Sequence, residues 1–280
     1  MTDGAQWFML PRGNGESPMH GREPMNVQTA DPRPLKHVAA GEQSTLYFTP
    51  SPEAEVALLA RMLYREGYNN HNWGHITYVQ PDGTILINPW EVPWDEMRAS
   101  DILRIDDKGN LLSGRWTVTP AVKLHLATHR LRPDVKVALH HHSEWGTVWA
   151  AAHELPPVLF QNGASIPKLA LYEEFEDTVV HDDLAEANVR AMGDADAAIL
   201  ANHGVFVVGE SIANAHWLAV TLELRCKVAW RVRAMGAEGV PLKQSAVDAL
   251  IRSVRKGIAG SRFHHAMIRR EVLADPSVLT

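Results

Sequence analysis

The stretch Val135–His142, V-K-V-A-L-H-H-H, decides the fold, and Ala197–Val208, A-A-I-L-A-N-H-G-V-F-V-V, matches it further along the chain. Both are apolar runs of strand length, far short of the ~20 residues that a membrane helix requires. Alternate side chains of a strand share a face, so we expect His140 and His142 on the same side. His203 follows the second run, where Gly204 is expected to permit a tight turn.

These three histidines indicate a metal site. Neutral imidazoles that converge at strand ends and leave coordination positions open are typical of catalytic Zn, Fe(II) or Mn sites. A histidine pair on a strand is weak support by itself, because most such pairs are structural, but the third histidine makes the metal interpretation the favoured one. We predict one divalent metal ion per subunit, Zn, Mn, Fe or Co, bound by His140, His142 and His203.

Outward from this stretch, strand and helix patterns mix along the chain. Strands are predicted at 74–80, 84–88, 102–106, 135–140, 158–160, 197–201 and 205–208. Helices are predicted between the cap Ser51 and Gly67, and at 122–131, 145–153, 184–192, 212–235, 247–258 and 266–273. Hairpin turns among the strands, as at Pro81-Asp82-Gly83, indicate an α/β sandwich whose sheet is mostly antiparallel.

Composition and charge indicate which classes of binding partner are expected. The 280 residues carry 33 acidic and 27 basic side chains, a formal net charge of -6. Without a basic run, nucleic acid is not expected as a partner, and no stretch is predicted to enter a membrane. The N-terminus lacks the apolar segment of a secretory signal and Cys226 is the single cysteine, so we expect a cytoplasmic protein.

Seven short blocks carry a family resemblance. They are Gly74-His75-Ile76-Thr77, Pro81-Asp82-Gly83, Leu86-Ile87-Asn88-Pro89, Ala99-Ser100-Asp101-Ile102, Arg132-Pro133-Asp134, His140-x-His142 and Asn202-His203-Gly204-Val205. In this order they resemble the class II aldolase and adducin N-terminal family over roughly residues 52–235. The resemblance implies an α/β/α sandwich around a central, mostly antiparallel sheet, a homotetramer, and His140, His142 and His203 as ligands of a divalent metal.

The resemblance also divides the chain. Residues 1–50, rich in Gly and Pro, are predicted to form an extended N-terminal arm, either a flexible tail or a strap over a neighbouring subunit or the site. Residues 51–240 are predicted to be a class II aldolase-like catalytic domain. Residues 241–280 are predicted to form a C-terminal helical extension.

Departures from the family pattern point away from sugar phosphates. Where the sugar-phosphate aldolases carry Ser-Ser-Glu, this chain has Thr119-Pro120-Ala121, so the catalytic carboxylate is missing. Gly74-His75 replaces a Gly-Asn, and Trp90-Glu91 replaces a Thr-Gly, both at phosphate-binding positions of the family. A phosphate would lose hydroxyl and backbone donors and meet an indole and a negative charge.

Aromatic side chains take the place of the phosphate clamp. Indole faces accommodate planar rings, so we predict that an aromatic acid contacts Trp73, Trp90, Trp94, Trp145 and Thr119. Each tryptophan has the alternative role of a core or subunit-contact residue. Members similar in lacking the aldolase glutamate include decarboxylases of aromatic acids and non-haem iron oxygenases.

The favoured function is therefore a metal-dependent carbon–carbon lyase that decarboxylates a hydroxylated aromatic acid. Decarboxylation requires an acid that protonates the ring carbon. His75 is the first candidate, because it falls on an active-site position of the family, followed by His71 and Glu144, the latter on the strand face of His142 if the strand continues. The alternatives are a non-haem iron oxygenase acting on an aromatic acid, an aldolase with a non-phosphorylated substrate, and an adducin-like structural module, which lacks the ligands.

Other polar residues have structural interpretations. His125 and His129 lie four apart on a predicted helix without the glutamate of a zinc-protease motif, which favours packing or subunit contacts. His264 is expected at the surface, and Glu223 is expected in a structural salt bridge.

Overall fold

The computed structural model describes residues 49–173, 182–254 and 258–280. All of these described residues belong to one compact unit. The predicted N-terminal arm lies outside the described residues except for its last two positions. None of the described helices combines the length and apolar run needed to cross a bilayer.

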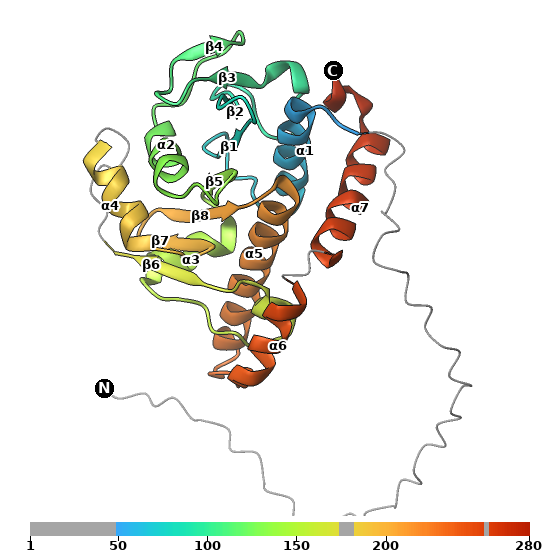
Figure 1. Cartoon of the computed structure of the whole chain (residues 1–280). Helices are drawn as coiled ribbons and strands as arrows, with labels where there is room; N and C mark the ends of the chain where they lie inside the picture. Colours follow the sequence, from blue (N-terminus) through green and yellow to red (C-terminus); the bar gives the residue numbers. More distant parts are fainter. Residues whose placement is uncertain (1–48, 174–181, 255–257) are drawn as a thin grey trace, which may run out of the picture. The chain divides into compact units, whose positions relative to one another are not determined.

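Helices and strands alternate along the described chain in the order predicted for an α/β protein (Figure 1). The helices are α1 Pro52–Arg65, α2 Val122–Leu131, α3 Glu144–Ala152, α4 Asp182–Met192, α5 Ile212–Ala234, α6 Gln244–Val254 and α7 Ile258–Ala274. The strands are β1 His75–Val79, β2 Ile85–Ile87, β3 Leu103–Ile105, β4 Leu111–Ser113, β5 Val137–His141, β6 Leu169–Tyr172, β7 Ala197–Leu200 and β8 Gly204–Gly209. Short 3-10 turns lie at Ala99–Asp101, Asn162–Ser165 and Pro276–Leu279.

The described strands form one sheet in the order β4-β3-β2-β1-β5-β8-β7-β6. Neighbouring strands are antiparallel except for the edge pair β6 and β7, which is parallel. The predicted mostly antiparallel sheet is therefore confirmed. The two stretches that the sequence singles out, β5 and β8, are direct neighbours at its centre, with His140 opposite Phe206.

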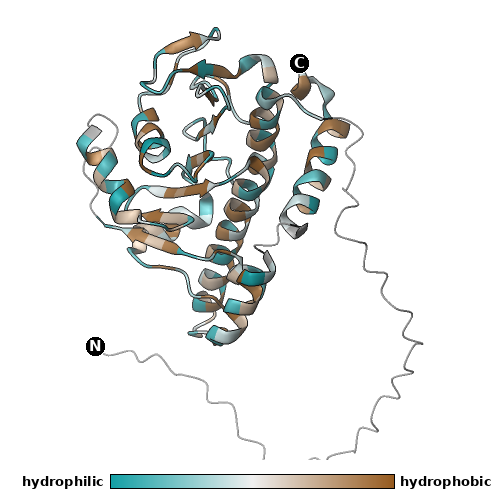
Figure 2. Cartoon of the chain, viewed as in Figure 1, coloured by the Kyte–Doolittle hydropathy of each residue, from teal (hydrophilic) through white to brown (hydrophobic). Residues whose placement is uncertain are grey.

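Helices cover both faces of this sheet, which completes the predicted α/β/α sandwich. On one face Val137 and Leu139 pack in a core with α1, α3, α5 and α7. On the other face Ala138 and Phe206 pack with residues of α2 and α4. Figure 2 shows hydrophobic and hydrophilic segments along α5, which buries polar side chains such as Glu223 and Arg225 as well as apolar ones.

Local sequence signals account for the long helices. Ser51 caps α1 by accepting a hydrogen bond from the Ala54 N–H at 3.1 Å, and Pro52 occupies the first position of the helix. Ser211 caps α5 in the same way through the Asn214 N–H. Both signals stand in the sequence, and both helices begin within one residue of the predicted start.

The prediction of a strand at 158–160 is wrong. This segment forms no strand; instead, Val158 accepts a backbone hydrogen bond from Leu242, and Leu159 packs against the helical core. Leu159 is thus partly buried against helices rather than by a neighbouring strand. Strands β4 and β6 were not predicted, and in β6 the run L-A-L-Y lacks the alternation that marks a half-buried strand.

The C-terminal residues pack on the rest of the unit. Helix α7 contacts α1 and α5, and the buried Arg61 of α1 donates to the Asp275 carboxylate at 2.7 Å. The expectation that His264 is at the surface is wrong, because it is 4% exposed and its Nδ1 lies 3.0 Å from Nδ1 of His216.

Candidate metal centre and adjoining cavity

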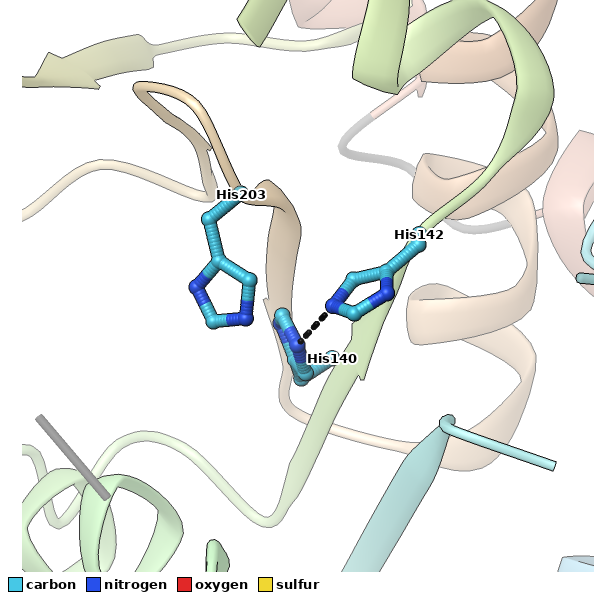
Figure 3. Close-up of side chains that lie close together, drawn as sticks. All are labelled: His140, His142 and His203. Carbon is cyan, nitrogen blue, oxygen red and sulfur yellow. Dashed lines mark hydrogen bonds between the residues drawn. The ribbon is translucent and has the colours of Figure 1, made fainter. Parts of the chain in front are cut away.

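Three histidines converge at the end of β5 (Figure 3). His140 is the fourth residue of β5, His142 follows the strand, and His203 lies in the turn between β7 and β8. One ligand nitrogen from each lies within 4.8 Å of the other two, and the described residues form no other such group of histidine, cysteine or carboxylate side chains. The structure thus brings together the three predicted ligands.

The contacts of these rings fit a divalent cation. His140 Nδ1 lies 3.0 Å from the Val205 carbonyl oxygen, to which it can only donate, so its Nε2 carries the lone pair. That Nε2 lies 3.3 Å from Nε2 of His142. Two ligands of one ion at about 2.0–2.1 Å have a comparable separation. The backbone carbonyl that fixes the tautomer is the outer partner that metal-bound histidines commonly have.

Burial keeps the three rings unprotonated. It lowers the pKa of His140 well below its ordinary value, with further lowering by His203 and His75. It also lowers the pKa of His142, and that of His203 to about 4. At neutral pH the three imidazoles are therefore in the form that a metal requires.

The turn that carries His203 differs from the expectation in one detail. The left-handed backbone conformation belongs to Asn202, with φ 55°, and not to Gly204. Glycine is needed at 204 for another reason: a Cβ there would lie 2.6 Å from the His141 carbonyl oxygen and 2.9 Å from the His142 ring. The absent side chain lets the start of β8 approach His141 and His142 closely.

A cavity of about 210 Å³ adjoins the three histidines. It is lined by Trp73, His75, Trp90, Thr119, Pro120, Ala121, Leu124, His125, His140, His142 and His203. None of these lining residues is an Asp, Glu, Lys or Arg. Apart from the three candidate ligands, the titratable groups at this wall are therefore His75 and His125.

His75 lies directly beside the candidate ligands. It pairs with His140 across the β1–β5 ladder, and the two rings stack with centroids 5.5 Å apart. Its Nε2 lies 3.2 Å from the Thr119 hydroxyl, whereas its buried Nδ1 has no hydrogen-bond partner. Burial lowers the pKa of His75 to about 3, and His142 and His203 contribute to the shift.

The predicted substrate residues divide into two groups. Trp73, Trp90 and Thr119 line the cavity, and the two indoles are 48% and 43% exposed. Trp94 does not, because it is 1% exposed in the core and packs against His141. Trp145 lies outside the lining, with its ring 5.0 Å from that of Trp230.

The remaining two candidate proton donors lie outside the cavity lining. The placement of Glu144 on the strand face of His142 is wrong: β5 ends at His141, and Glu144 is the first, exposed residue of α3. His71 is exposed and stacks on Trp73, with ring centroids 5.0 Å apart. Of the three candidates, the structure thus brings only His75 to the cavity.

Glu223 supports the segment after β5, and its carboxylate forms no salt bridge with the described residues, where a salt bridge was predicted. Its carboxylate accepts backbone hydrogen bonds from Trp145 at 2.7 Å and Gly146 at 3.0 Å, at the start of α3. Burial raises its pKa, while these hydrogen bonds act in the opposite direction. The favourable interaction of an anion with a helix N-terminus explains an acidic residue here.

Sequence reasoning missed His125 and Leu124 as cavity residues. Both lie on α2, whose first turn forms one wall of the cavity. The spacing of His125 and His129 placed them on one face of the helix, but only the packing of α2 on the sheet shows that this face meets β1.

The part of the chain that holds the histidine cluster and the cavity matches a known protein family. Residues 54–230 match the model of the class II aldolase and adducin N-terminal domain. The chain belongs to this family. All three candidate ligands and every residue that lines the cavity fall within the matched part.

Individual relatives of this class II aldolase-family chain differ in their named activities. Decarboxylase NovR of Streptomyces niveus is 26% identical over 80% of this chain and 85% of its own length. A 4-hydroxy-3-prenylphenylpyruvate oxygenase/4-hydroxy-3-prenylbenzoate synthase of Streptomyces roseochromogenus is 28% identical over 66% of this chain and 69% of its own. The structure of L-fuculose 1-phosphate aldolase from Glaciozyma antarctica has a TM-score of 0.72 at 20% identity, covering 81% of this chain and 90% of the other.

Proposed function

We propose that this protein is a metal-dependent carboxy-lyase that removes carbon dioxide from a hydroxylated aromatic acid. One observation carries the proposal: the cavity combines a three-histidine cluster with two exposed indoles and a buried imidazole, and its lining has no carboxylate. The similarity to a decarboxylase over most of both chains supports it.

The lining of the cavity suits a planar acid. Trp73 and Trp90 offer ring faces, and Leu124 and Pro120 add apolar surface. Helix α2 begins at this wall at Val122, after a cap residue, Ala121, whose side chain makes no capping hydrogen bond. The partial positive charge of a helix N-terminus favours a carboxylate there.

In this proposal His140, His142 and His203 hold one divalent ion, either Zn, Mn, Fe or Co. When bound, the ion acts as a Lewis acid for the oxygens of the substrate, taking up negative charge as the carbon–carbon bond breaks. The indoles orient the ring, and the apolar wall excludes water.

His75 supplies the proton that replaces carbon dioxide on the ring carbon. It lies next to the cluster, and the Thr119 hydroxyl at 3.2 Å from its Nε2 fixes the orientation of the ring. A group that protonates carbon must give up its proton readily. Because burial lowers the pKa of His75 to about 3, the ring is neutral at pH 7, and it releases a proton from one nitrogen only as it takes up another at the other nitrogen.

A screen of substrates tests the proposal. Purified protein loaded with Mn, Zn or Co is expected to release one carbon dioxide per molecule of a hydroxylated aromatic acid, without oxygen, while sugar phosphates are not turned over. Turnover that requires Fe(II) and consumes dioxygen would assign the oxygenase activity named for one relative instead. Turnover of sugar phosphates at a kcat of about 1 per second or more contradicts the proposal.

We also propose that the chain assembles as a homotetramer. Exposed apolar side chains of α3 and α5 support an assembly, because Val148, Leu224 and Trp230 are each more than a third exposed. Light scattering at micromolar concentration is expected to give about four times the 31.1 kDa of the chain. A monomeric mass at this concentration rules the assembly out.

A further inference from the structure

A chain of hydrogen bonds leads away from the cavity between β1 and α2. The Thr77 Oγ1 lies 2.9 Å from Nδ1 of His125 and 2.7 Å from Nε2 of His129. Alternation along β1 places Thr77 on the same sheet face as His75, and the four-residue spacing places both histidines on one face of α2. The hydroxyl is therefore held between two imidazoles by regular secondary structure.

The two ends of this chain lie in different surroundings. His125 is fully buried and lines the cavity, and its Nε2 has no hydrogen-bond partner. Its ring meets that of His75 edge to face, with centroids 5.9 Å apart. His129 is partly exposed, and its Nδ1 lies 3.4 Å from the Val135 carbonyl oxygen. The chain thus joins the cavity wall to a residue that is partly exposed.

These groups have the chemistry that proton transfer requires. A hydroxyl has one hydrogen, so at least one of the two rings must donate to Thr77 Oγ1, while the hydroxyl can pass its own hydrogen onward. A neutral imidazole accepts a proton at one nitrogen and releases one from the other. Burial lowers the pKa of His125 far below its ordinary value and that of His129 to about 4, so both rings are neutral at pH 7.

We propose that His125, Thr77 and His129 form a route along which a proton moves between the cavity and the solvent side of α2. The Val135 carbonyl can only accept, so His129 carries its hydrogen on Nδ1, its Nε2 accepts from the Thr77 hydroxyl, and His125 Nδ1 donates to the Thr77 oxygen. A proton from the cavity binds His125 Nε2, the Nδ1 proton of His125 passes to the Thr77 oxygen, the hydroxyl proton passes to His129 Nε2, and His129 releases its Nδ1 proton to solvent. One proton enters and one leaves, both rings end neutral, and the same steps in reverse deliver one proton to the cavity.

The use of this proton depends on the proposed decarboxylation, which consumes one proton per turnover. Thr77 and His129 act through His125 and position the transfer, without touching the substrate.

Two substitutions of Thr77 test the route in the full-length protein as purified. Thr77→Val keeps the shape and removes the hydroxyl, whereas Thr77→Ser keeps the hydroxyl. NMR of ring-labelled histidine measures how fast the His125 ring N–H exchanges with water. We expect Thr77→Val to slow this exchange at least about tenfold and Thr77→Ser to leave it unchanged. The tenfold figure is a lower bound, since a positioned proton-transfer group contributes roughly 10²–10⁴-fold. Equal exchange rates in Val and wild type, or a Ser variant as slow as Val, overturn the proposal.

A second variant covers the case in which Thr77→Val does not fold. His129→Gln retains a polar group for the Thr77 hydroxyl but cannot pass a proton between two nitrogens. We therefore expect the same slowing of the His125 N–H exchange, and an unchanged exchange rate overturns the route. In the carbon dioxide assay both variants should turn over slowly, and added imidazole should restore part of the rate. If the wild type releases no carbon dioxide, the proposed function fails, while the exchange comparison still decides the route.

Discussion

Replacing His142 with Ala is expected to remove the metal. The cluster then has two imidazoles. A catalytic ion with open coordination positions needs three protein ligands, and two do not hold it in place. We expect the affinity for the divalent ion to fall by more than about 100-fold. Loss of a residue that only hydrogen-bonds to a ligand already costs roughly 10–100-fold. Elemental analysis after dialysis, with titration calorimetry for the affinity, measures the effect.

The control for this experiment is His153→Asn. His153 is exposed, lies outside the cavity lining, and has a left-handed backbone, φ 54°, that asparagine tolerates. This variant should keep about one equivalent of metal per chain. If a variant with all three candidate ligands changed to Ala still bound a full equivalent at the same place, the metal centre would be assigned wrongly.

Replacing His75 with Gln is expected to stop the proton transfer while leaving the metal in place. Glutamine can still accept or donate a hydrogen bond at Thr119, but it has no titratable nitrogen. Loss of a positioned acid lowers kcat by roughly 10²–10⁴-fold. Carbon dioxide release under saturating substrate measures the effect, and elemental analysis confirms one metal per chain.

The same substitution at His71 provides the matched control. His71 is exposed outside the lining of the cavity, so His71→Gln should turn over within about twofold of the wild type, as surface substitutions generally do. A fully active His75→Gln protein would remove His75 as the proton donor without affecting the metal assignment. His125 would then be the remaining candidate among the lining residues that are not ligands.

The cluster of three histidines could be predicted because its signals are local. Alternation in a strand puts His140 and His142 on one face whatever the rest of the chain does, and β5 and β8 are apolar enough to be central. Ser51 and Ser211 mark helix starts in the same local way. Each of these features depends on a few consecutive residues.

The roles of the tryptophans could not be predicted in this way. Trp90 and Trp94 are four residues apart in one loop, yet the first is 43% exposed at the cavity and the second is 1% exposed in the core. Only the packing of the loop on the sheet separates them. Glu144 is different, because Ser143 before it is a common helix cap, and that signal could have shown that β5 does not continue.

The triplet His140-His141-His142 shows how much depends on the alignment of a single strand. The middle imidazole lies in the core against Tyr68 and Trp94, with neither ring nitrogen hydrogen-bonded, while its two neighbours face the cavity. The three side chains are chemically identical, so only the pairing of the strand determines which of them face the cavity and which is buried in the core. A slip by one residue would bury two imidazoles and leave a single ring at the cavity, so the apolar residues Val137 and Leu139 also safeguard the chemistry.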